Sequence, residues 1–343
     1  MTNSLDPRLV AILRCPHCKG ILQLEREASL ECRACSKAYR IVHGIPDLRV
    51  YEDPLISLED DFAKGEKIHL QAQSLGFADL VRYYWSLPTY PDTPIELRDR
   101  FINHVLKDEQ RCQSYAHRLG SGDRFLEVGC GTAALTKVVH GQFKLAVGCD
   151  VAFRWLLVAR KRLEEAGLPA NLVCCCADYL PFAADSFDTV ASVAVLERLD
   201  DSQAAISESA RVLRSRGRVF AWTANRFSVA PEPHVRVWGV GFLPRRWMAP
   251  YVKLARGMAY DHINLLSIWE IRRYCRAVGL ERLELALPVI SDADWSHLRG
   301  MERLAAHVFQ LAAEISPLAG LLRIISPVIL FTAYKPVATG VVP

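Results

Sequence analysis

Short apolar runs and amphipathic segments alternate along most of the chain after residue 121. Residues 124–128, 144–149 and 187–193 are near-continuous apolar runs, and residues 153–166 and 202–213 repeat apolar positions with the period of a helix. Apolar runs without polar alternation are typical of parallel strands that helices cover on both faces. The alternation therefore predicts an α/β domain built on a doubly wound sheet.

The same pattern predicts the remaining elements and the division of the chain. Further strands are expected at residues 171–176, 218–223, 280–287 and 328–334, and further helices at residues 133–140 and 267–278. Residues 96–119 fit one amphipathic helix or two. We therefore expect four parts: an N-terminal module at residues 1–50, a helical connector or cap at 51–120, the α/β domain at 121–225 and 265–337, and an insertion at 226–264.

The composition places the chain among globular proteins. Hydrophobic residues make up 51% and charged residues 23% of the 343 residues, which excludes disordered and collagen-like chains. The net charge of +4 neither requires nor excludes a nucleic-acid partner. The most apolar stretch, residues 315–334, contains Arg323 and two prolines, so no transmembrane segment is expected. The N-terminus lacks the basic and apolar regions of a signal peptide, so we expect a cytoplasmic protein.

Four of the eleven cysteines form two Cys-x-x-Cys pairs, Cys15 with Cys18 and Cys32 with Cys35. An odd number of cysteines argues against a complete disulfide framework. Two facing pairs supply the four sulfur ligands of a closed tetrahedral Zn²⁺ site, so we predict a structural zinc ion that stabilises the N-terminal module and takes no part in chemistry. The alternative is two unrelated cysteine pairs in a reducing compartment. The three cysteines at residues 174–176 lie in an apolar run and are expected to be buried.

A glycine turn follows the first strand of the expected α/β domain. Gly129 and Gly131 allow the backbone to turn tightly and to approach a ligand where a Cβ atom would collide. Asp150 ends the second strand, nineteen residues after Gly131, where a carboxylate can accept hydrogen bonds from a ribose diol. Asp178 ends the third strand. The turn lacks the Gly-Lys-Ser/Thr of a phosphate-binding loop, so the pattern favours a nucleoside site and disfavours an ATPase.

Three motifs carry a resemblance to a known family. The sequence Glu127-Val128-Gly129-Cys130-Gly131-Thr132, then Gly148-Cys149-Asp150, then residues 177–182 with 185–188 are similar to the ordered motifs of class I S-adenosylmethionine-dependent methyltransferases of the type 11 group. The resemblance spans residues 123 to about 334. It implies a seven-stranded Rossmann-like sheet, S-adenosylmethionine as the cofactor and methyl transfer as the reaction.

The resemblance also implies which residues bind the cofactor. Glu127 and the turn formed by Gly129, Cys130, Gly131 and Thr132 would line the methionine part. The other implied contacts are Asp150 at the ribose hydroxyls, Val151 beside the adenine, Asp178 and Tyr179 at the adenine edge, and Val193 as a further member of the site.

Two positions depart from the family pattern. Ala133 takes the place of a third glycine that many relatives have, and its small side chain is expected to be compatible with the turn. Arg198 takes the place of the histidine that is common after Glu197, so the role of that histidine does not carry over. The alternative class is a dinucleotide-dependent dehydrogenase, which also uses a glycine turn and a ribose acid. The Leu-Pro-Phe segment after Asp178 argues against that class.

The N-terminal module resembles the zinc ribbon of the tRNA-methyltransferase-activating family. The resemblance rests on Cys15-Pro16-His17-Cys18-Lys19-Gly20 and on residues 39–48, and it covers about the first 50 residues. In relatives the module is either a separate activating subunit or a fused N-terminal domain. The resemblance therefore implies a small ribbon of short strands, two of which are expected at residues 20–24 and 38–42.

The insertion at residues 226–264 is the expected place for acceptor chemistry. Methyl transfer to a hydroxyl benefits from a general base, and the insertion supplies His234, Asp261 and His262 as candidates. The alternative is that these side chains only stabilise a lid over the site. No Asn/Asp-Pro-Pro-Tyr and no Pro-Cys follows residues 187–193, so base-amine and cysteine-initiated C5 methylation are disfavoured. We expect O-methylation, or N-methylation of an amine, on a small molecule, a sugar or a lipid-linked glycan in a biosynthetic pathway.

Two other functions stay open at this point. Ribosomal or transfer RNA methyltransferases also combine a zinc ribbon with this fold, and a nucleic-acid partner would meet the basic residues Arg211, Arg214, Arg216 and Arg218 or Arg245 and Arg246. The alternative for these arginines is a solvated helix end and turn, which we favour. A third function is a non-catalytic scaffold that binds the cofactor, which the complete set of Glu127, Asp150 and Asp178 disfavours.

Overall fold

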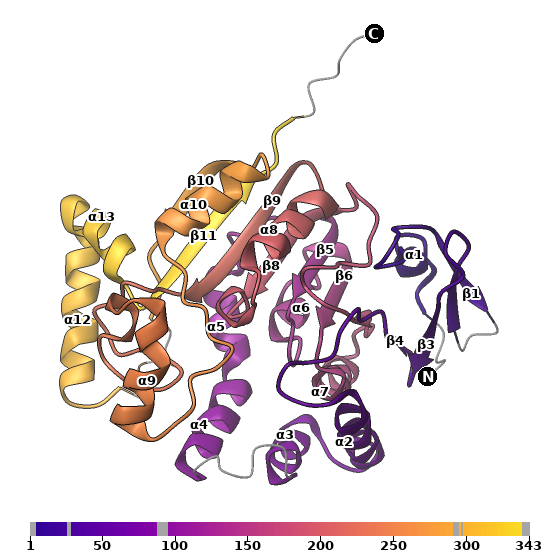
Figure 1. The fold of residues 1–343 in the computed structure, drawn as a ribbon, viewed down its shortest axis with the longest axis horizontal. Helices are drawn as coiled ribbons and strands as arrows, with labels where there is room; N and C mark the ends of the chain where they lie inside the picture. Colours follow the sequence, from indigo (N-terminus) through magenta and orange to yellow (C-terminus); the bar gives the residue numbers. More distant parts are fainter. Residues whose placement is uncertain (1–4, 26–28, 88–94, 291–294, 296–297, 338–343) are drawn as a thin grey trace. The chain divides into compact units, whose positions relative to one another are not determined.

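The structure, a computed structural model, describes residues 5–25, 29–87, 95–290, 295 and 298–337. The described chain divides into two compact units. The first unit holds residues 1–190 and 211–214, and the second holds residues 191–210 and 215–343. Figure 1 shows the helices and strands of the chain with their labels.

The first unit begins with a small antiparallel sheet. Its strands β1 (Leu22–Glu25), β2 (Ser29–Cys32), β3 (Ala38–Val42) and β4 (Ile45–Pro46) lie in sequential order. His43 and Gly44 both have positive φ, the geometry of a two-residue type I′ hairpin turn between β3 and β4. The sheet matches the ribbon expected for the N-terminal module, and the sequence pattern had predicted β1 and β3 but not β2 or β4.

Helices α2 (Leu58–Gln71), α3 (Phe77–Ser86), α4 (Ile95–Leu106) and α5 (Asp108–Ala116) follow the ribbon. The N-terminus of α2 is capped by Ser57, whose hydroxyl accepts a hydrogen bond from the backbone of Asp60. Apolar side chains of α2 and α3 form one buried cluster with those of α7 (Phe153–Glu165). Tyr84 of α3 is buried in this cluster, with its ring stacked on that of Trp155 at 3.8 Å between centroids, and is a core residue.

The larger sheet has seven strands in the order β10-β11-β9-β8-β5-β6-β7. Its strands are β5 (Gly122–Val128), β6 (Phe143–Asp150), β7 (Leu172–Cys174), β8 (Phe187–Val193), β9 (Leu213–Ala224), β10 (Glu281–Ala286) and β11 (Val328–Tyr334). The strand pairs β5–β6 and β6–β7 are parallel, whereas β11 is antiparallel to both β9 and β10. The expected Rossmann-like methyltransferase sheet is confirmed, with a mixed rather than an all-parallel set of strands.

The ribbon is docked on the β7 edge of the larger sheet, within the first unit. Asp47 forms a parallel bridge with Cys174, and the Leu48 amide donates to the Cys174 carbonyl at 2.8 Å. On the other side of the ribbon, the Arg14 amide donates to the Pro181 carbonyl at 2.8 Å. These bonds satisfy backbone groups that an uncovered edge strand would expose. The three cysteines at residues 174–176 are buried beneath this junction, as expected.

The second unit contains α8 (Ser202–Val212), α9 (Arg245–Arg256), α10 (Ile268–Ala277), α12 (Met301–Glu314) and α13 (Ser316–Ile325). Helix α10 begins with a capping box in which Ser267 and Glu270 exchange hydrogen bonds with each other's backbone. The sequence pattern predicted α8 and α10 but not α9, α12 or α13. Among the described helices, none combines the length and the apolar composition that a bilayer crossing requires.

Candidate active site and metal centre

The turn after β5 leaves its backbone open toward one side. Gly129 and Gly131 have φ of 70° and 49°, the left-handed region that favours glycine. The amides of Gly129 and Cys130 both donate to the Cys149 carbonyl, at 2.8 and 2.9 Å. A Cβ built on Gly131 would meet no atom within 4 Å, so the space beside the turn is free. Ala133 also has a positive φ of 57° and adopts the turn without a third glycine, at a strain of about 1 kcal/mol.

Asp150, at the end of β6, faces this turn. Its Oδ2 accepts from the Gly131 amide at 2.8 Å, and its Oδ1 accepts from the Ala152 amide at 2.9 Å. Burial raises the pKa of this carboxyl group. Each carboxylate oxygen can accept a second hydrogen bond, so the group can still receive two hydroxyls of a ribose. This is the geometry that the predicted role of Asp150 requires.

Glu127, on β5, is buried and holds the start of the next helix. Its Oε2 accepts from both the amide and the hydroxyl of Thr136, at 2.8 and 2.6 Å. Burial raises the pKa of Glu127 to about 8. Thr132, in the turn, donates its hydroxyl to Asp108 at 3.2 Å. Contact of Glu127 and Thr132 with the methionine part of the cofactor stays a prediction.

Asp178, expected at the adenine edge, is hydrogen-bonded by a residue that the sequence analysis missed. Tyr51, in the segment after the ribbon, donates its phenolic hydroxyl to Asp178 Oδ1. The Tyr51 ring lies edge-on to that of Tyr179, with 6.2 Å between centroids, and both rings are partly exposed. No local motif marks Tyr51 in the sequence, since its position depends on how the ribbon docks on β7.

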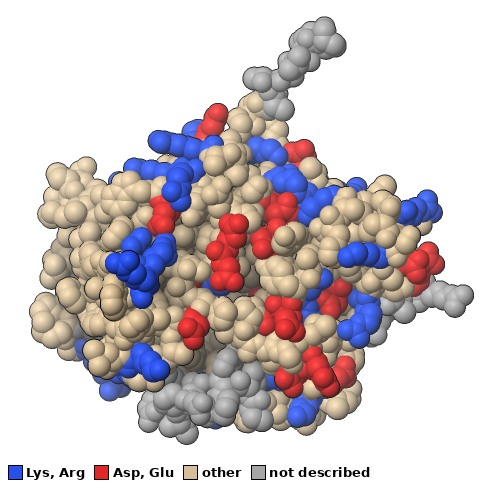
Figure 2. Space-filling model, in the orientation of Figure 1, with Lys and Arg blue, Asp and Glu red and all other residues tan. Residues whose placement is uncertain are grey.

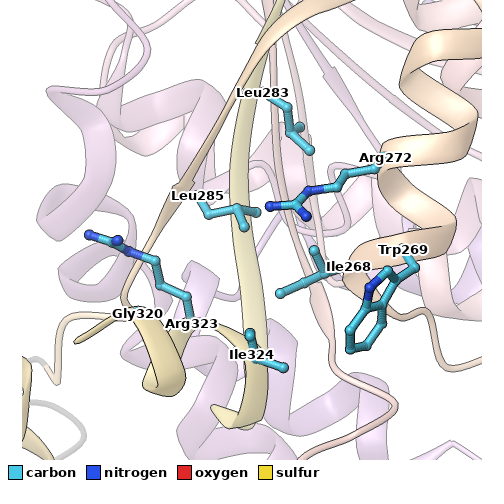
Figure 3. A pocket seen from close by; sticks show the side chains of 8 residues that line it. All are labelled: Ile268, Trp269, Arg272, Leu283, Leu285, Gly320, Arg323 and Ile324. Carbon is cyan, nitrogen blue, oxygen red and sulfur yellow. The ribbon is translucent and has the colours of Figure 1, made fainter. Parts of the chain in front are cut away.

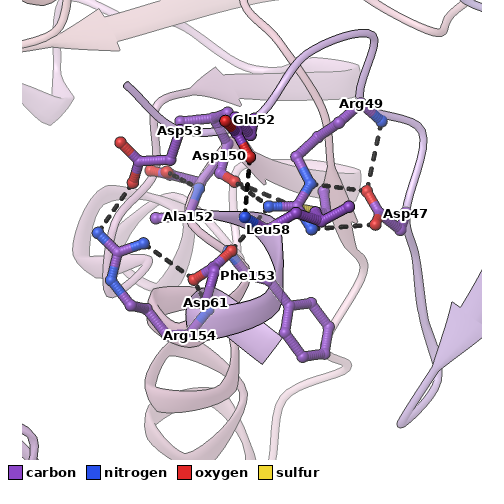
Figure 4. A network of polar contacts seen from close by, with 12 residues as sticks. Asp47, Arg49, Glu52, Asp53, Leu58, Asp61, Asp150, Ala152, Phe153 and Arg154 are labelled. Atoms are coloured by element: carbon purple, nitrogen blue, oxygen red, sulfur yellow. Dashed lines mark hydrogen bonds and ion pairs between the residues drawn. The ribbon is translucent and has the colours of Figure 1, made fainter. Parts of the chain in front are cut away.

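A buried network of charges supports the turn between β6 and α7 (Figure 4). Asp61 of α2 accepts from the amides of Phe153 and Arg154 and forms ion pairs with Arg49 and Arg154, at 2.7 and 2.9 Å. Arg49 also pairs with Asp47 at 2.8 Å and donates to the Val151 carbonyl at 3.1 Å. The last residues of the ribbon therefore hold the loop that carries Asp150 and Val151.

The four cysteines of the ribbon come together as a metal site. Their sulfur atoms lie within 4.8 Å of one another, with Cys15 and Cys35 at 3.6 Å and Cys18 and Cys32 at 3.4 Å. Tetrahedral Zn²⁺ with Zn–S bonds of about 2.3 Å requires sulfur atoms about 3.8 Å apart, so the set fits a structural zinc ion.

Tyr39 and Gly20 both favour four thiolate ligands at this site. Burial raises the pKa of Cys15, but hydrogen bonds from the Tyr39 hydroxyl and from backbone amides outweigh it and lower this pKa to about 6. A Cβ on Gly20 would lie 3.0 Å from the Cys32 sulfur and 3.2 Å from the Cys18 sulfur. Glycine at this position therefore leaves the space that the sulfur cluster occupies.

In the second unit, His234 lies between two carboxylates. Its Nδ1 is 2.5 Å from Glu232 Oε1, and its Nε2 is 4.0 Å from Glu197 Oε1. Glu232 is fixed in turn, because its Oε2 accepts from the amides of His234 and Val235, both at 2.8 Å. Glu197 accepts the Thr223 hydroxyl at 2.7 Å. His234 was predicted as a candidate base from the sequence, whereas the role of Glu232, two residues before it, was not.

The other two candidates for a general base are placed differently. Asp261 and His262 are exposed, and neither forms a hydrogen bond or an ion pair with any residue that the structure describes. Val193 is the last residue of β8. A catalytic role for Asp261 or His262, and a cofactor contact for Val193, stay predictions.

Several of the arginines that an RNA partner would need are engaged within the protein. Arg211 donates to the carbonyls of Leu180 and Phe182, at 2.9 and 2.8 Å. Arg214 pairs with Asp188 at 3.0 Å, and Arg245 pairs with Glu270 at 2.7 Å. These contacts favour a structural role for these guanidinium groups over a phosphate-binding one.

Comparisons with known proteins agree with this geometry. A family model described as a methyltransferase domain matches residues 126–221, and a Trm112p-like family model matches residues 6–44. A ubiquinone biosynthesis O-methyltransferase of Aromatoleum aromaticum is 29% identical over 167 residues, which cover 48% of this chain and 67% of that protein. The methyltransferase GfsG of Streptomyces halstedii is 31% identical over 150 residues, covering 42% of this chain and 50% of that protein.

One solved structure with a similar fold is a complex between the Haloferax volcanii Trm112 methyltransferase activator and a methyltransferase. The match to one chain of that complex has a TM-score of 0.46 and 16% identity, and it covers 68% of this chain and 92% of that chain. The sheet, the glycine turn and the family matches define a class I S-adenosylmethionine-dependent methyltransferase. Residues 126–221 therefore resemble the matched methyltransferase domain, and a Trm112p-like module with four clustered cysteines precedes them. S-adenosylmethionine is its cofactor.

Proposed function

We propose that this methyltransferase methylates a hydroxyl group of a small organic acceptor and that His234 is the general base. The observation that carries the proposal is the placement of the His234 ring between Glu232 and Glu197, with Glu232 at 2.5 Å from Nδ1. An imidazole whose Nδ1 is held by a carboxylate presents Nε2 as a proton acceptor, and the carboxylate stabilises the imidazolium that forms.

The place of His234 in the chain supports this role. The insertion that carries His234 follows the carboxyl end of β9, and doubly wound sheets bind their ligands outside the carboxyl ends of the strands. The cofactor supplies an activated methyl group when bound. Nε2 of His234 would accept the proton of the acceptor hydroxyl, and Glu232 would keep the ring in the required tautomer.

The relatives and the insertion both support a small, largely apolar acceptor. The Aromatoleum aromaticum relative is named for O-methylation in ubiquinone biosynthesis. The insertion of this chain exposes Trp238, Phe242 and Trp247, each more than half accessible to solvent. Aromatic side chains on a binding surface favour apolar and aromatic ligands. We propose a phenolic or comparable hydroxyl as the acceptor, ahead of a sugar or a lipid-linked glycan.

An RNA acceptor is the second candidate function, and the Trm112p-like ribbon is the observation that favours it. The internal pairing of Arg211, Arg214 and Arg245 weighs against it. The zinc thiolate cluster requires reduced cysteines, which supports the proposal that the protein works in a reducing compartment such as the cytoplasm.

A transfer assay with radiolabelled S-adenosylmethionine tests this proposal. Purified protein is incubated with a panel of phenols, catechols, glycosides and bulk tRNA, and the productive acceptor is then used with variants. His234→Ala is expected to lower kcat by about 10² to 10⁴ fold while leaving S-adenosylhomocysteine binding unchanged. His117→Ala, at an exposed position directly after α5, is the control and is expected to keep kcat within about threefold. Full activity of His234→Ala, or transfer to tRNA alone, would contradict the proposal.

A further inference from the structure

Helices α12 and α13 each expose a row of large apolar side chains, and the two rows together are called the apolar stripe. Met301, Leu304, Val308 and Leu311 recur at intervals of three and four residues on α12, and Ile315, Leu318, Leu321 and Ile324 continue the stripe through α13. Met301 is 79% and Leu311 is 66% exposed. In Figure 2 the surface over these helices, at the left of the view, is mostly tan.

These two helices bury few of their large apolar side chains. Ala306 and Ala319 are buried and Phe309, Leu322 and Ile325 are half-buried, whereas the side chains of the stripe are exposed. A surface helix of a globular protein normally turns its large apolar residues toward the core. A contiguous exposed apolar surface of this kind marks a contact with a partner or a membrane.

A groove with two arginines lies beside the stripe (Figure 3). It has a volume of about 440 Å³ and is lined by Ile268, Trp269 and Arg272 of α10, Leu283 and Leu285 of β10, and Gly320, Arg323 and Ile324 of α13. Figure 3 shows the Arg272 side chain reaching over Ile268 toward Leu285. Neither Arg272 nor Arg323 forms a hydrogen bond or ion pair with another described residue. The groove therefore offers two uncompensated positive charges among apolar walls.

The charge of the surrounding sequence points to an anionic partner. The second unit has 17 Lys and Arg against 13 Asp and Glu, a net charge of +4. Arg299, Arg303 and Arg323 lie on or next to the stripe, and Glu314 is the one acidic residue of α12 and α13 whose side chain the structure describes. A partner with an apolar interior and an anionic surface would match both the apolar stripe and the arginines beside it.

We propose that the stripe and the adjoining groove bind the surface of an anionic lipid bilayer. The aliphatic side chains of α12 and α13 enter the boundary between headgroups and acyl chains, as in interfacial amphipathic helices. The exposed Trp269 lies at the level of the headgroups, and Arg272 and Arg323 bind lipid phosphates. A second copy of the chain fits less well, because a twofold contact through the stripe would bring the same arginines of both copies together.

This inference goes beyond the proposed function and does not depend on the acceptor. It predicts that the protein is recruited to membranes through the second unit. Vesicle binding is measured without any methyl transfer, so its failure is distinguishable from failure of the proposed catalytic role of His234.

Co-sedimentation of the full chain with vesicles tests the proposal. One set of vesicles contains phosphatidylcholine with about a third phosphatidylglycerol, and the other contains phosphatidylcholine alone. The wild type is expected to bind the anionic vesicles at least tenfold more tightly, with an affinity that falls as salt is raised. Leu304→Glu with Leu311→Glu is expected to abolish binding. Arg272→Gln with Arg323→Gln is expected to remove the preference for anionic vesicles.

Leu70→Glu is the matched control, since Leu70 is 61% exposed on α2 of the first unit, and it is expected to bind like the wild type. Circular dichroism checks that each variant is folded. Wild-type levels of binding in Leu304→Glu with Leu311→Glu would overturn the proposal. A second result would also overturn it: the wild type does not bind vesicles and elutes as a dimer in size-exclusion chromatography, whereas the double variant elutes as a monomer. The stripe would then be a contact between two copies of the chain.

Discussion

The hydroxyl of Tyr51 donates a hydrogen bond to the carboxylate of Asp178. The donor belongs to the segment that leaves the zinc ribbon, and the acceptor is the acid that the family resemblance assigns to the adenine edge of the cofactor. The same segment contributes Arg49, which donates to the carbonyl of Val151 beside Asp150. The ribbon is therefore connected to both ends of the predicted nucleoside site, and its folding is expected to affect cofactor binding.

Removal of the Tyr51 hydroxyl tests this connection. Tyr51→Phe keeps the ring against Tyr179 but leaves Asp178 without its donor, so we expect S-adenosylhomocysteine to bind about three- to tenfold more weakly, the effect of one hydrogen bond. Isothermal titration calorimetry measures the change. Tyr274→Phe on α10 of the second unit serves as the control. An unchanged affinity would show that the Tyr51–Asp178 bond does not support the site.

Asp61 is expected to be the most sensitive single position of the network in Figure 4. It is completely buried and is bound by two arginines and two backbone amides. Asp61→Asn removes the negative charge between Arg49 and Arg154, so we expect the free energy of unfolding to fall by about 3 to 5 kcal/mol.

Urea denaturation measures this loss, and Asp79→Asn is the matched control. Asp79 forms an ion pair with Arg82 on the exposed face of α3, with both side chains more than half accessible. Surface pairs of this kind contribute little, so the control is expected to change stability by less than about 1 kcal/mol. Equal effects of the two substitutions would contradict the structural role of Asp61.

Zinc is expected to be bound once per chain, and its removal is expected to unfold the ribbon. Elemental analysis measures the zinc content per chain, and thermal unfolding with and without a strong chelator measures the effect of zinc removal. Gly20→Ala is expected to destabilise the loaded protein because the new Cβ would crowd the sulfur atoms of Cys18 and Cys32. Ala38→Gly, on an exposed ribbon position outside the sulfur cluster, is the control. Protein prepared without chelator that contains no zinc would refute the metal assignment.

Glu127 gives a pH dependence with a defined sign. Its pKa is about 8 in the folded protein, against about 4.3 in an unfolded chain. Between these values the folded state holds a proton that the unfolded state has lost, so this group's stabilising contribution is complete below pH 4 and is lost as the pH rises through 8.

The corresponding measurement compares the wild type with Glu127→Gln. From pH 6 to 8 the unfolding free energy of the wild type should fall relative to that of the variant, by up to about 1.4 kcal/mol per pH unit. The comparison is needed because Lys64, whose pKa burial lowers to about 7, contributes an opposite trend above pH 7 in both proteins. Parallel stability curves for the two proteins would contradict the raised pKa of Glu127.

Features with a local sequence pattern could be predicted. The two Cys-x-x-Cys pairs, the glycine turn and Asp150 are defined by spacing within one or two elements, and the structure brings the sulfur atoms together and places Asp150 against Gly131. Strands β5, β6 and β7 could be recognised because buried parallel strands are almost continuously apolar.

Features that depend on tertiary contacts could not be predicted. Tyr51 reaches Asp178 only because the ribbon docks on β7, which no motif announces. The contact between Glu232 and His234 was not predicted, because a spacing of two residues in a loop does not by itself bring a carboxylate and a histidine ring together. Helix α13 was missed because most of its residues are apolar, so the sequence showed no polar face that would mark a surface helix, although the strand at residues 328–334 was predicted.

We propose that the nucleoside cofactor lies against the open turn at Gly131 and is held by Asp150. Calorimetric titration of S-adenosylhomocysteine into the wild type and into Asp150→Ala tests this claim most directly, with Asp79→Ala as a surface control. We predict one site per chain and an affinity about 10 to 100 fold lower in Asp150→Ala, from the loss of hydrogen bonds to a charged group. The same affinity in wild type and Asp150→Ala would contradict the account.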